Sequence, residues 1–590
     1  MKNKIWSALF SHLSIPAISK AEKIRQTFRP VEKVIFFILA LGLLFSALAL
    51  FTSANRYFTV EIPKDGGTLR EGIVGFPRFI NPLFAISDAD RDLTGLVYSG
   101  LLSYEPGAGL VPNLAEDYQI SDDGLSYTFK LKKDLTFQDG APLTADDVAF
   151  TILKAQDPNL KSPKRPNWDG VKIEKIGDLE IRFTLSQPYA PFLENATLGI
   201  LPKHLWQDVS ADQFTFTTLN TEPVGSGPYK IKSLSRDQSG LPEFYELVPF
   251  KNYALGKPHI LNLITKFYTT SDKALTALEM KELDSLSTIS PHDALRLKSG
   301  GENVVTTALP RIFGIFFNQN QATIFANKEV RQALNLATNK DSIVEEVLDG
   351  YATKLTGPIP PGFLGSNLND TASESDDFDN ARLALATSTL EKNGWKKNTS
   401  GIYEKKSKKE SQLLSFSIAT ANTPELKATA DILKNQWQKI GAEVDIKIFE
   451  PGDLNQNVIR PRKYDALLFG EVVGRDLDLF AFWHSSQRID PGLNIALYAS
   501  IKADKLLSDG RKLSDRAIQI DKYRQFEDLV ADDLPAIFLY SPDFIYVIPK
   551  SLQGLTLGTI NTPAERFADI QDWYLSTERV WKIFAPKEQN

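Results

Sequence analysis

Alternating apolar and polar positions predict the clearest strand of the chain between Leu125 and Leu131. Every second residue in this segment is large and apolar, and the residues between them are Ser126, Thr128 and Lys130. A period of two places the apolar side chains on one face of a strand. An Asp-Gly pair lies on each side of the segment, and glycine accepts the positive φ of a tight turn without steric cost.

The region from about residue 68 to residue 152 is rich in such strands and ends in a helix. Thr144 precedes the apolar-periodic segment that starts this helix, and Asp147 follows three residues later, as in a capping box. Residues 172–188 again show the pattern of a hairpin. The first part of the folded chain is therefore predicted to be mostly strands.

A different pattern begins near Arg311. An apolar strand at residues 311–318 is followed by a helical spacing of apolar residues at 327–339. A buried type of strand at 413–420, a helix that starts after Thr423 and stops at Gly441, and a strand at 443–449 then form a strand-helix-strand unit. Such a unit implies parallel strands and a right-handed crossover. We therefore expect a separate α/β lobe, followed at 534–548 by aromatic strands interrupted at a Ser-Pro pair.

The N-terminal region contains a membrane-spanning candidate. Val34 to Thr52 is a run of nineteen residues without a charge, which is long enough for most of a ~30 Å hydrocarbon core. Residues 1–33 carry seven Lys/Arg and two Glu, so the positive-inside rule places them in the cytoplasm. We expect a basic cytoplasmic segment at 1–33, an uncleaved anchor at 34–53 and a short linker at 55–67. A signal peptide cleaved near Ala47–Ala49 is the alternative.

Composition narrows the function classes. The 590 residues are 42% apolar and 24% charged with a net charge of −6, so nucleic acid is not an expected partner. The chain has no cysteine, which excludes disulfides, thiolate metal sites, cysteine catalysis and a lipid-bearing N-terminal cysteine.

No pattern of residues indicates an enzyme. The five histidines include no two within five residues of each other, and neither a GxSxG elbow nor a GxxxxGK phosphate loop occurs. These are the spacings that zinc, nucleophilic or phosphate chemistry requires. We therefore expect neither an enzyme nor a bound cofactor or metal.

Seven segments of the chain stand out together. The longest is PNLAEDYQISDDGLSYTFKLKKDLTFQDGAPLTADDVAFTI at residues 112–152. The others are FINPLF (79–84), LVYSGLL (96–102), PVGSGPYKI (223–231), VRQALNLATNK (330–340), GPIPP (357–361) and FAFWHSSQ (480–487). In sequence and in order these segments resemble the signatures of the family 5 extracellular solute-binding proteins, the peptide-, nickel- and oligosaccharide-binding components of ABC importers.

The resemblance implies a two-lobed α/β periplasmic-binding-protein-like flytrap fold with mixed sheets, preceded by one transmembrane helix. Lobe I would comprise residues 54–310 together with 541–590, and lobe II residues 311–540. The expected function is the binding of peptides between the lobes and their delivery to a membrane permease driven by a separate ATPase. We expect a monomer in the plasma membrane, single-pass, with the binding domain outside the cytoplasm. The alternatives are another solute, such as an oligosaccharide or a nickel complex, or a sensor that imports nothing.

Candidate ligand-binding residues come from loops around the matched segments. They are Phe76, Asn81, Ser226, Gly227, Glu471, Arg475, Asp476, Trp483, Ser486, Gln487 and Asn494.

Several of these residues have structural alternatives. Trp483 is equally suited to packing in a core, and Ser226 to satisfying its own turn. Asp476 and Asp478 are equally suited to capping the helix that follows them.

The resemblance also raises the question of how the amine of a peptide is held. The aspartate that typically anchors a peptide α-amino group in this family aligns at or near Val473. Either Glu471 or Asp476 takes over, or the ligand lacks a free amine there. We favour the second, because Arg475 adjoins Asp476 and would neutralise it.

Overall fold

The computed structural model describes residues 29–361, 363, 376–406, 411–475, 477–513 and 515–584. By its internal contacts the chain divides into two compact units. One combines residues 1–64 with 577–590, and the other comprises residues 65–576.

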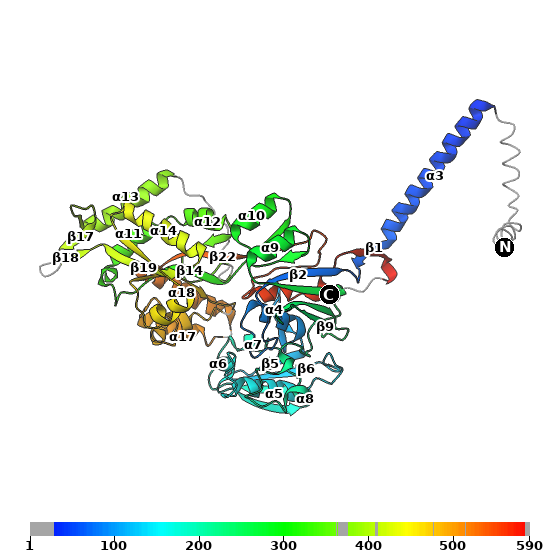
Figure 1. Ribbon diagram of the computed structural model, residues 1–590, viewed down its shortest axis with the longest axis horizontal. Coiled ribbons are helices and arrows are strands. Elements are labelled where there is room, and N and C mark those ends of the chain that lie inside the picture. Colours follow the sequence, from blue (N-terminus) through cyan, green and yellow to red (C-terminus); the bar gives the residue numbers. More distant parts are fainter. Residues whose placement is uncertain are drawn as a thin grey trace. The chain divides into compact units, whose positions relative to one another are not determined.

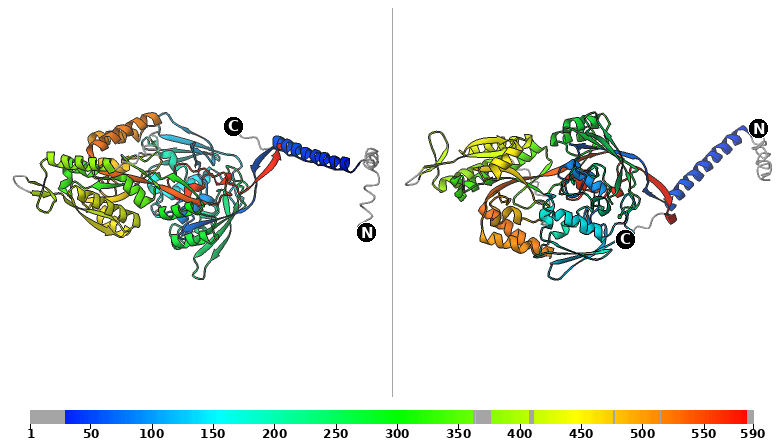
Figure 2. Two further views of the ribbon diagram at one scale, coloured as in Figure 1. Left: turned by 90° about the horizontal axis from the view of Figure 1, so that it is seen from above. Right: turned by 60° about the horizontal axis from the view of Figure 1, so that its bottom comes forward.

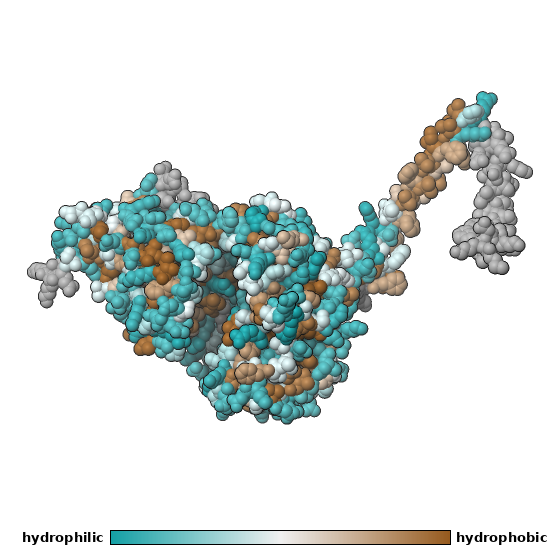
Figure 3. All heavy atoms as spheres, in the orientation of Figure 1, coloured by the Kyte–Doolittle hydropathy of each residue, from teal (hydrophilic) through white to brown (hydrophobic). Residues whose placement is uncertain are grey.

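The smaller unit consists of a long helix and a two-stranded ribbon. Helix α3 (Pro30–Phe58) is longer than the predicted run and exposes its apolar side chains along its whole length (Figure 3). Strand β1 (Thr59–Pro63) follows it directly and pairs antiparallel with β23 (Thr577–Trp581) (Figure 1). The predicted linker at 55–67 is thus wrong in part, because its first residues complete the helix and the next five form a strand.

The larger unit is built around a mixed sheet of twelve strands. Ten of them follow the order β20-β19-β21-β14-β22-β12-β2-β11-β10-β9, while β13 and β15 pair with β22. The bounds are β2 (Thr68–Val74), β9 (Tyr229–Arg236), β10 (Pro242–Pro249), β11 (Asn262–Tyr268), β12 (Ser285–Leu286), β13 (Asn303–Ala308), β14 (Arg311–Phe317), β15 (Ala352–Lys354), β19 (Ser415–Ala421), β20 (Glu443–Phe449), β21 (Ala466–Val472) and β22 (Ala536–Ile548).

The predicted alternation at residues 125–131 is confirmed. Strand β6 (Ser126–Leu131) buries Tyr127, Phe129 and Leu131 and lies inside a four-stranded antiparallel sheet. It pairs with β5 (Ala115–Ile120) on one side and with β8 (Glu180–Thr184) on the other. Strand β7 (Lys172–Gly177) pairs with β8, and these two strands are the predicted hairpin. Helix α5 (Ala145–Gln156) begins with the predicted capping box, in which Asp147 accepts a hydrogen bond from the Thr144 backbone.

Other helices of this region are short, and one small hairpin accompanies them. The helices are α4 (Asp88–Val97), α6 (Arg165–Trp168), α7 (Phe192–Asn195), α8 (Lys203–Trp206), α9 (Ser271–Glu279) and α10 (Pro291–Ser299). The hairpin pairs β3 (Leu102–Glu105) with β4 (Gly109–Pro112).

The predicted strand-helix-strand unit is also confirmed. Strands β19 and β20 pair in parallel and are joined by α14 (Pro424–Lys439). The indole of Trp437 on this helix donates to the Leu334 carbonyl at 3.1 Å, which ties α14 to α11 (Lys328–Leu336). Further elements of the region are α12 (Lys340–Leu348), α13 (Asp376–Lys392), α16 (Phe480–Trp483), α17 (Ile501–Gly510), α18 (Arg516–Asp533) and a small sheet of β16 (Lys396–Lys397), β17 (Tyr403–Lys406) and β18 (Ser411–Leu413).

The buried apolar side chains form two large clusters with separate stretches of chain. The first core is drawn from Leu69–Leu309 and Phe544–Trp573, and the second core from Ile312–Tyr540. Two smaller clusters lie around α9 and α10. Figure 2 shows the long strand β22 running from one region into the other.

The expected interruption at Ser541-Pro542 is wrong, because β22 is continuous over thirteen residues. Its partner changes there instead: residues 536–540 pair with β14, and 543–548 with β13. The missing N–H of a proline is tolerated at such a change of partner. Ser541 Oγ donates to the Leu309 carbonyl at 2.7 Å, and Leu309 N–H donates to the Pro542 carbonyl at 3.2 Å. The two segments that pass between the cores are therefore hydrogen-bonded to each other.

Candidate functional site

Arg475 lies where side chains of the two core regions meet. It follows β21 in the chain segment of the second core, and its guanidinium pairs with Glu565 and, at 3.3 Å, with Glu194. The same guanidinium lies 3.8 Å from the ring centroid of Tyr104. Glu194, Glu565 and Tyr104 all belong to the chain segments of the first core. We call these four residues the Arg475 cluster.

The first core fixes the two carboxylates of the cluster. Glu194 is on α7, whose Phe192 is buried against Trp168 and Tyr127. Glu565 also accepts a hydrogen bond from Asn561 N–H at 2.9 Å and directly precedes Arg566. These contacts leave Glu194 and Glu565 little freedom to follow Arg475 if it moves away.

Arg566 anchors the segment that carries Glu565. Its side chain is fully buried and pairs with Glu71 of β2 at 2.8 Å and with Asp92 of α4 at 2.6 Å. Tyr546 on β22 donates to the other oxygen of Glu71 at 2.8 Å. Buried charges are tolerated when they are paired and hydrogen-bonded in this way.

The charged groups of the Arg475 cluster shift one another's pKa values. Burial lowers the pKa of Arg475, but the carboxylates of Glu565 and Glu194 outweigh it and hold that pKa above its usual value. Burial raises the pKa of Glu565, and Arg475 opposes this shift. Removing the guanidinium would thus leave two acids facing each other in a poorly hydrated place.

A cavity of about 240 Å³ adjoins the cluster. It is lined by residues from both core regions: Tyr104, Gly109, Leu110, Glu194, Phe363, Arg475 and Thr559. Figure 3 shows a hollow in one face of the larger unit. The lining combines aromatic faces with one cation and one carboxylate, which suits a ligand that has both apolar and charged parts.

A second set of contacts joins the same two regions beside the cluster. Asp478 pairs with Arg511 at 2.7 Å and accepts a longer hydrogen bond, at 3.3 Å, from the hydroxyl of Tyr189. Ala190 N–H donates to the Arg511 carbonyl at 3.2 Å. The segment 189–194 therefore meets the loops after β21 and α17 at several points. Asp478, for which helix capping was the structural alternative, thus forms an ion pair with Arg511.

The candidate residues of the first lobe have structural partners. Asn81 is fully buried, and its amide donates to Asn220 Oδ1 at 3.0 Å. Phe76 packs, partly buried, against the first core. A Cβ at Gly227 would lie 2.5 Å from the carbonyl carbon of Val97, so glycine is needed there for backbone packing. Ser226 is buried next to it, and its hydroxyl oxygen has no hydrogen-bond partner among the described residues.

Glu471 is the most unusual of the second-lobe candidates. It lies near the end of β21, is 4% exposed, and neither carboxylate oxygen has a hydrogen-bond partner in the described part of the chain. Burial raises its pKa well above the usual value, because a poorly hydrated environment disfavours the charged carboxylate.

Two further candidates lie inside the second core. Trp483 is 1% exposed and contacts the rings of Phe316 and Phe538. Asn494 is fully buried and its amide donates to three backbone carbonyls, including that of Tyr498 at 2.9 Å. Both have the environment of packing residues.

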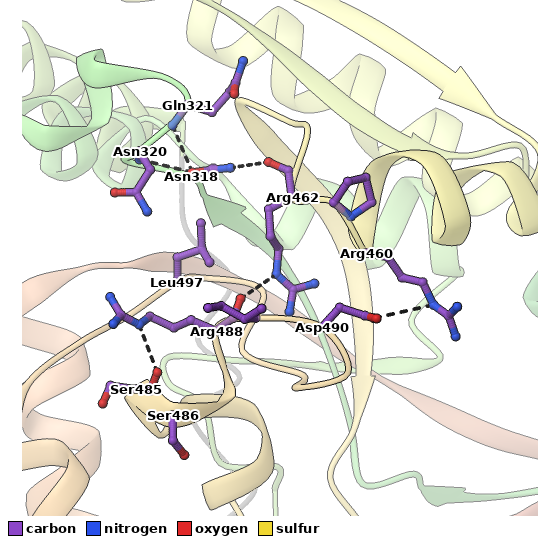
Figure 4. A pocket seen from close by; sticks show the side chains of 12 residues that line it. Asn318, Asn320, Gln321, Arg460, Arg462, Ser485, Ser486, Arg488, Asp490 and Leu497 are labelled. Carbon is purple, nitrogen blue, oxygen red and sulfur yellow. Dashed lines mark hydrogen bonds and ion pairs between the residues drawn. The ribbon is translucent and has the colours of Figure 1, made fainter.

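Ser486 and Gln487 lie away from the Arg475 cluster. Ser486 helps line a larger hollow of about 800 Å³ built from loops of the second region alone, shown in Figure 4 with Arg460, Arg462 and Arg488. Gln487 donates to Ser486 Oγ at 3.1 Å. The guanidinium of Arg462 is committed to the carbonyls of Ile459, Arg488 and Gly492. Asp476 lies outside the described residues.

The expected neutralisation of Asp476 by Arg475 lies outside the described residues and stays a prediction. The guanidinium of Arg475 pairs with Glu194 and Glu565. Those two acids, with Tyr104 and Phe363, are what the sequence analysis missed. They are up to 461 positions apart in the chain, and no local pattern distinguishes them from surface residues. Among the described residues, no cluster of His, Asp and Glu suited to a metal ion occurs.

Comparison with known proteins identifies the family. The profile of the bacterial extracellular solute-binding proteins, family 5, matches residues 109–488. The oligopeptide-binding protein AppA of Bacillus subtilis is 30% identical over 522 residues, which cover 87% of this chain and 92% of that protein.

Solved structures agree with this assignment. The crystal structure of B. subtilis AppA with a nonapeptide matches with a TM-score of 0.66 at 29% identity, covering 87% of this chain and all of that one. Campylobacter jejuni NikZ with Ni(L-His) matches with a TM-score of 0.66 at 28% identity and the same coverage. The predicted periplasmic-binding-protein-like α/β fold is confirmed, and the chain belongs to family 5 of the bacterial extracellular solute-binding proteins.

Proposed function

We propose that this protein is the membrane-tethered peptide receptor of an ABC importer, and that it closes its two lobes around an extended peptide. The observation that carries the proposal is the Arg475 cluster, in which one region supplies a cation and the other two carboxylates beside a shared cavity. Relatives that are named for oligopeptide binding support peptides as the solute. A nickel complex, as bound by NikZ, is the competing ligand.

The lobes follow the two cores. Lobe I takes residues 54–310 with 541–590, of which 54–64 and 577–590 belong to the smaller unit and not to the first core. Lobe II takes residues 311–540. The hinge is the hydrogen-bonded pair of crossings at Leu309 and Ser541–Pro542. A hinge of two short segments absorbs the backbone rotation while both cores move as rigid bodies.

Peptide entry requires the lobes to separate. A cavity of 240 Å³ has the volume of about eight water molecules, which is too small for an extended peptide of several residues. The contacts of Arg475 and Asp478 with the first region therefore describe a closed arrangement that must open to load the ligand. A ligand that contacts both lobes then favours closure through its differential affinity.

The proposed cellular arrangement follows from the anchor. Helix α3 keeps the monomeric receptor in the plasma membrane with its lobes outside the cytoplasm. The tether raises the local concentration of the receptor at its permease, and a separate ATPase supplies the energy for import. No catalytic step is part of this role.

The way the peptide amine is held is a further part of the proposal. Burial raises the pKa of Glu471, which disfavours the charged carboxylate that an ammonium group needs. Glu194 and Glu565 are already paired with Arg475, and Asp476 lies outside the described residues. Affinity is therefore expected to depend weakly on a free N-terminus.

Calorimetric titration of the full chain in detergent with short peptides tests these points. Binding of unrelated peptides, accompanied by a negative heat-capacity change from burial of apolar surface, is expected. An N-acetylated peptide should bind within a few-fold of its free counterpart. A loss of a hundredfold or more on acetylation, which corresponds to about 2.7 kcal/mol, would refute the expectation for the amine. Absence of peptide binding together with binding of a nickel complex would refute the peptide assignment itself.

A further inference from the structure

The smaller unit exposes a group of large apolar side chains next to the transmembrane candidate. Tyr57 and Phe58 end α3, and Trp581, Ile583 and Phe584 belong to the C-terminal segment. Their exposed fractions are 71%, 51%, 53%, 80% and 76%, in that order. Side chains of this type are seldom left exposed together. We call β1, β23 and the turn Lys582–Phe584 the terminal ribbon.

Strand register brings the C-terminal segment back to the end of the helix. Thr59, the first residue after α3, pairs with Trp581, and Pro63 pairs with Thr577 (Figure 2). Because the strands are antiparallel, the chain beyond Trp581 continues toward α3. The ring of Trp581 stacks on that of Phe58 with centroids 6.1 Å apart, and Lys582 Nζ lies 5.1 Å from the ring centroid of Tyr57.

The kind of side chain changes along the length of the terminal ribbon. Its aromatic residues lie at the helix end, whereas Glu61 and Arg579 form an ion pair, at 2.8 Å, two residues farther from the helix. The aromatic end also carries Arg56 and Lys582. Aromatic rings beside basic side chains, followed by an exposed ion pair, are typical of a membrane interface.

The rise along α3 sets the depth of these aromatic side chains relative to the bilayer. The uncharged run of α3 ends at Thr52, and Phe58 is the sixth residue after it. At 1.5 Å per residue the rise from Thr52 to Phe58 is roughly 9 Å. The headgroup region on each side of a bilayer is about 5–8 Å thick. When the run spans the hydrocarbon, Tyr57, Phe58 and the ring of Trp581 stacked on it therefore lie at the boundary between headgroups and water, and the chain beyond Trp581 continues back toward the headgroups.

We propose that the terminal ribbon is a second membrane contact, which rests on the proposed anchor: its aromatic end inserts into the headgroup region of the outer leaflet. The C-terminus of the extracytoplasmic domain is thereby fixed at the bilayer beside the N-terminal helix. The occupant is lipid because these exposed side chains lie only about 9 Å along the axis beyond the apolar run of α3, and that run is itself unburied. Tyr and Trp are the side chains preferred at this depth, since their rings combine an apolar body with a polar atom.

Single-site labelling tests the proposal, and the absence of native cysteine makes it specific. Ile583→Cys, Phe584→Cys and Arg579→Cys are each labelled with the environment-sensitive dye NBD in the full chain. The proteins are reconstituted into vesicles of phosphatidylethanolamine and phosphatidylglycerol. Phe216→Cys serves as the matched control, because Phe216 is 86% exposed and belongs to the larger unit.

Lipid nitroxide quenchers are expected to quench the labels at 583 and 584 at least threefold more than the label at 216, with iodide in the water showing the reverse order. The label at 579 should give intermediate values. Equal accessibility of 583, 584 and 216 to iodide would overturn the proposal and leave the permease as the partner of this surface. Carbonate extraction and peptide titration of the same labelled proteins separate this result from failure of the anchor or of ligand binding.

Discussion

Replacing Arg475 with glutamine should open the ligand-free protein. The substitution removes an ion pair with Glu194, an ion pair with Glu565 and the stacking on Tyr104. The arginine side chain is 10% exposed and its partners are 26% and 23% exposed, so the pairs lie between surface pairs, worth about 0–1 kcal/mol, and buried pairs, whose disruption costs about 3–5 kcal/mol. We expect a loss of about 2 kcal/mol from the closed state, or about 30-fold in its equilibrium with the open state.

Pulsed electron–electron resonance measures this equilibrium directly. Spin labels at Phe216→Cys and Ile489→Cys report the separation of the lobes, because both positions are more than 80% exposed and belong to different core regions. Arg460→Gln is the matched control, since its partner Asp490, at 3.6 Å, lies in the same region. The control should keep the parent distance distribution, and Arg475→Gln should shift it to longer distances. An unchanged distribution in Arg475→Gln would refute the assignment of the cluster as a closing contact.

Three further substitutions test individual structural claims by thermal or denaturant unfolding. Gly227→Ala should destabilise the protein by about 2–3 kcal/mol through overpacking against Val97. The control Gly95→Ala, whose Cβ meets nothing within 4 Å, should be neutral or stabilising by up to about 1 kcal/mol. Equal effects of the two substitutions would contradict the packing argument. Glu471→Gln should stabilise the protein relative to the parent, progressively above pH 5. The pKa of Glu471 is raised in the folded state, so the parent loses stability as the pH rises from the pKa of the unfolded state toward that of the folded state. A stability difference that does not change with pH would count against a buried acid with a raised pKa. Arg566→Met should lower the free energy of unfolding by at least about 3 kcal/mol, because it leaves two buried carboxylates unpaired. Arg579→Met at the exposed ribbon should lower it by less than about 1 kcal/mol. Similar losses of stability would contradict the buried ion-pair network around Arg566.

The sequence predicted those parts of the fold that rest on local patterns. The alternation around Tyr127, the capping box at Thr144 and the strand-helix-strand unit around α14 each depend on neighbours a few residues apart, and each is present. The continuity of β22 through Pro542 was not predictable locally, because it depends on two partner strands that are distant in the chain.

Only part of the candidate site could be predicted from the sequence, because its residues come from segments that are distant in the chain. Arg475 was singled out from its loop, but its partners Glu194 and Glu565 become recognisable only after both cores have folded. Asn81 and Trp483 were singled out because they lie in matched segments, and Asn494 because it follows one closely. The surroundings of all three are those of structural residues. Ligand contact by the candidate residues stays a prediction.

Native mass spectrometry of the full chain, purified in mild detergent from its own cells, tests the central claim most directly. The account predicts a heterogeneous set of bound species that, after release by denaturation, fragment as short peptides of varied sequence. Arg475→Gln should retain fewer of them than Arg460→Gln does. A single non-peptide ligand, such as a metal chelate, in place of this mixture would contradict the account.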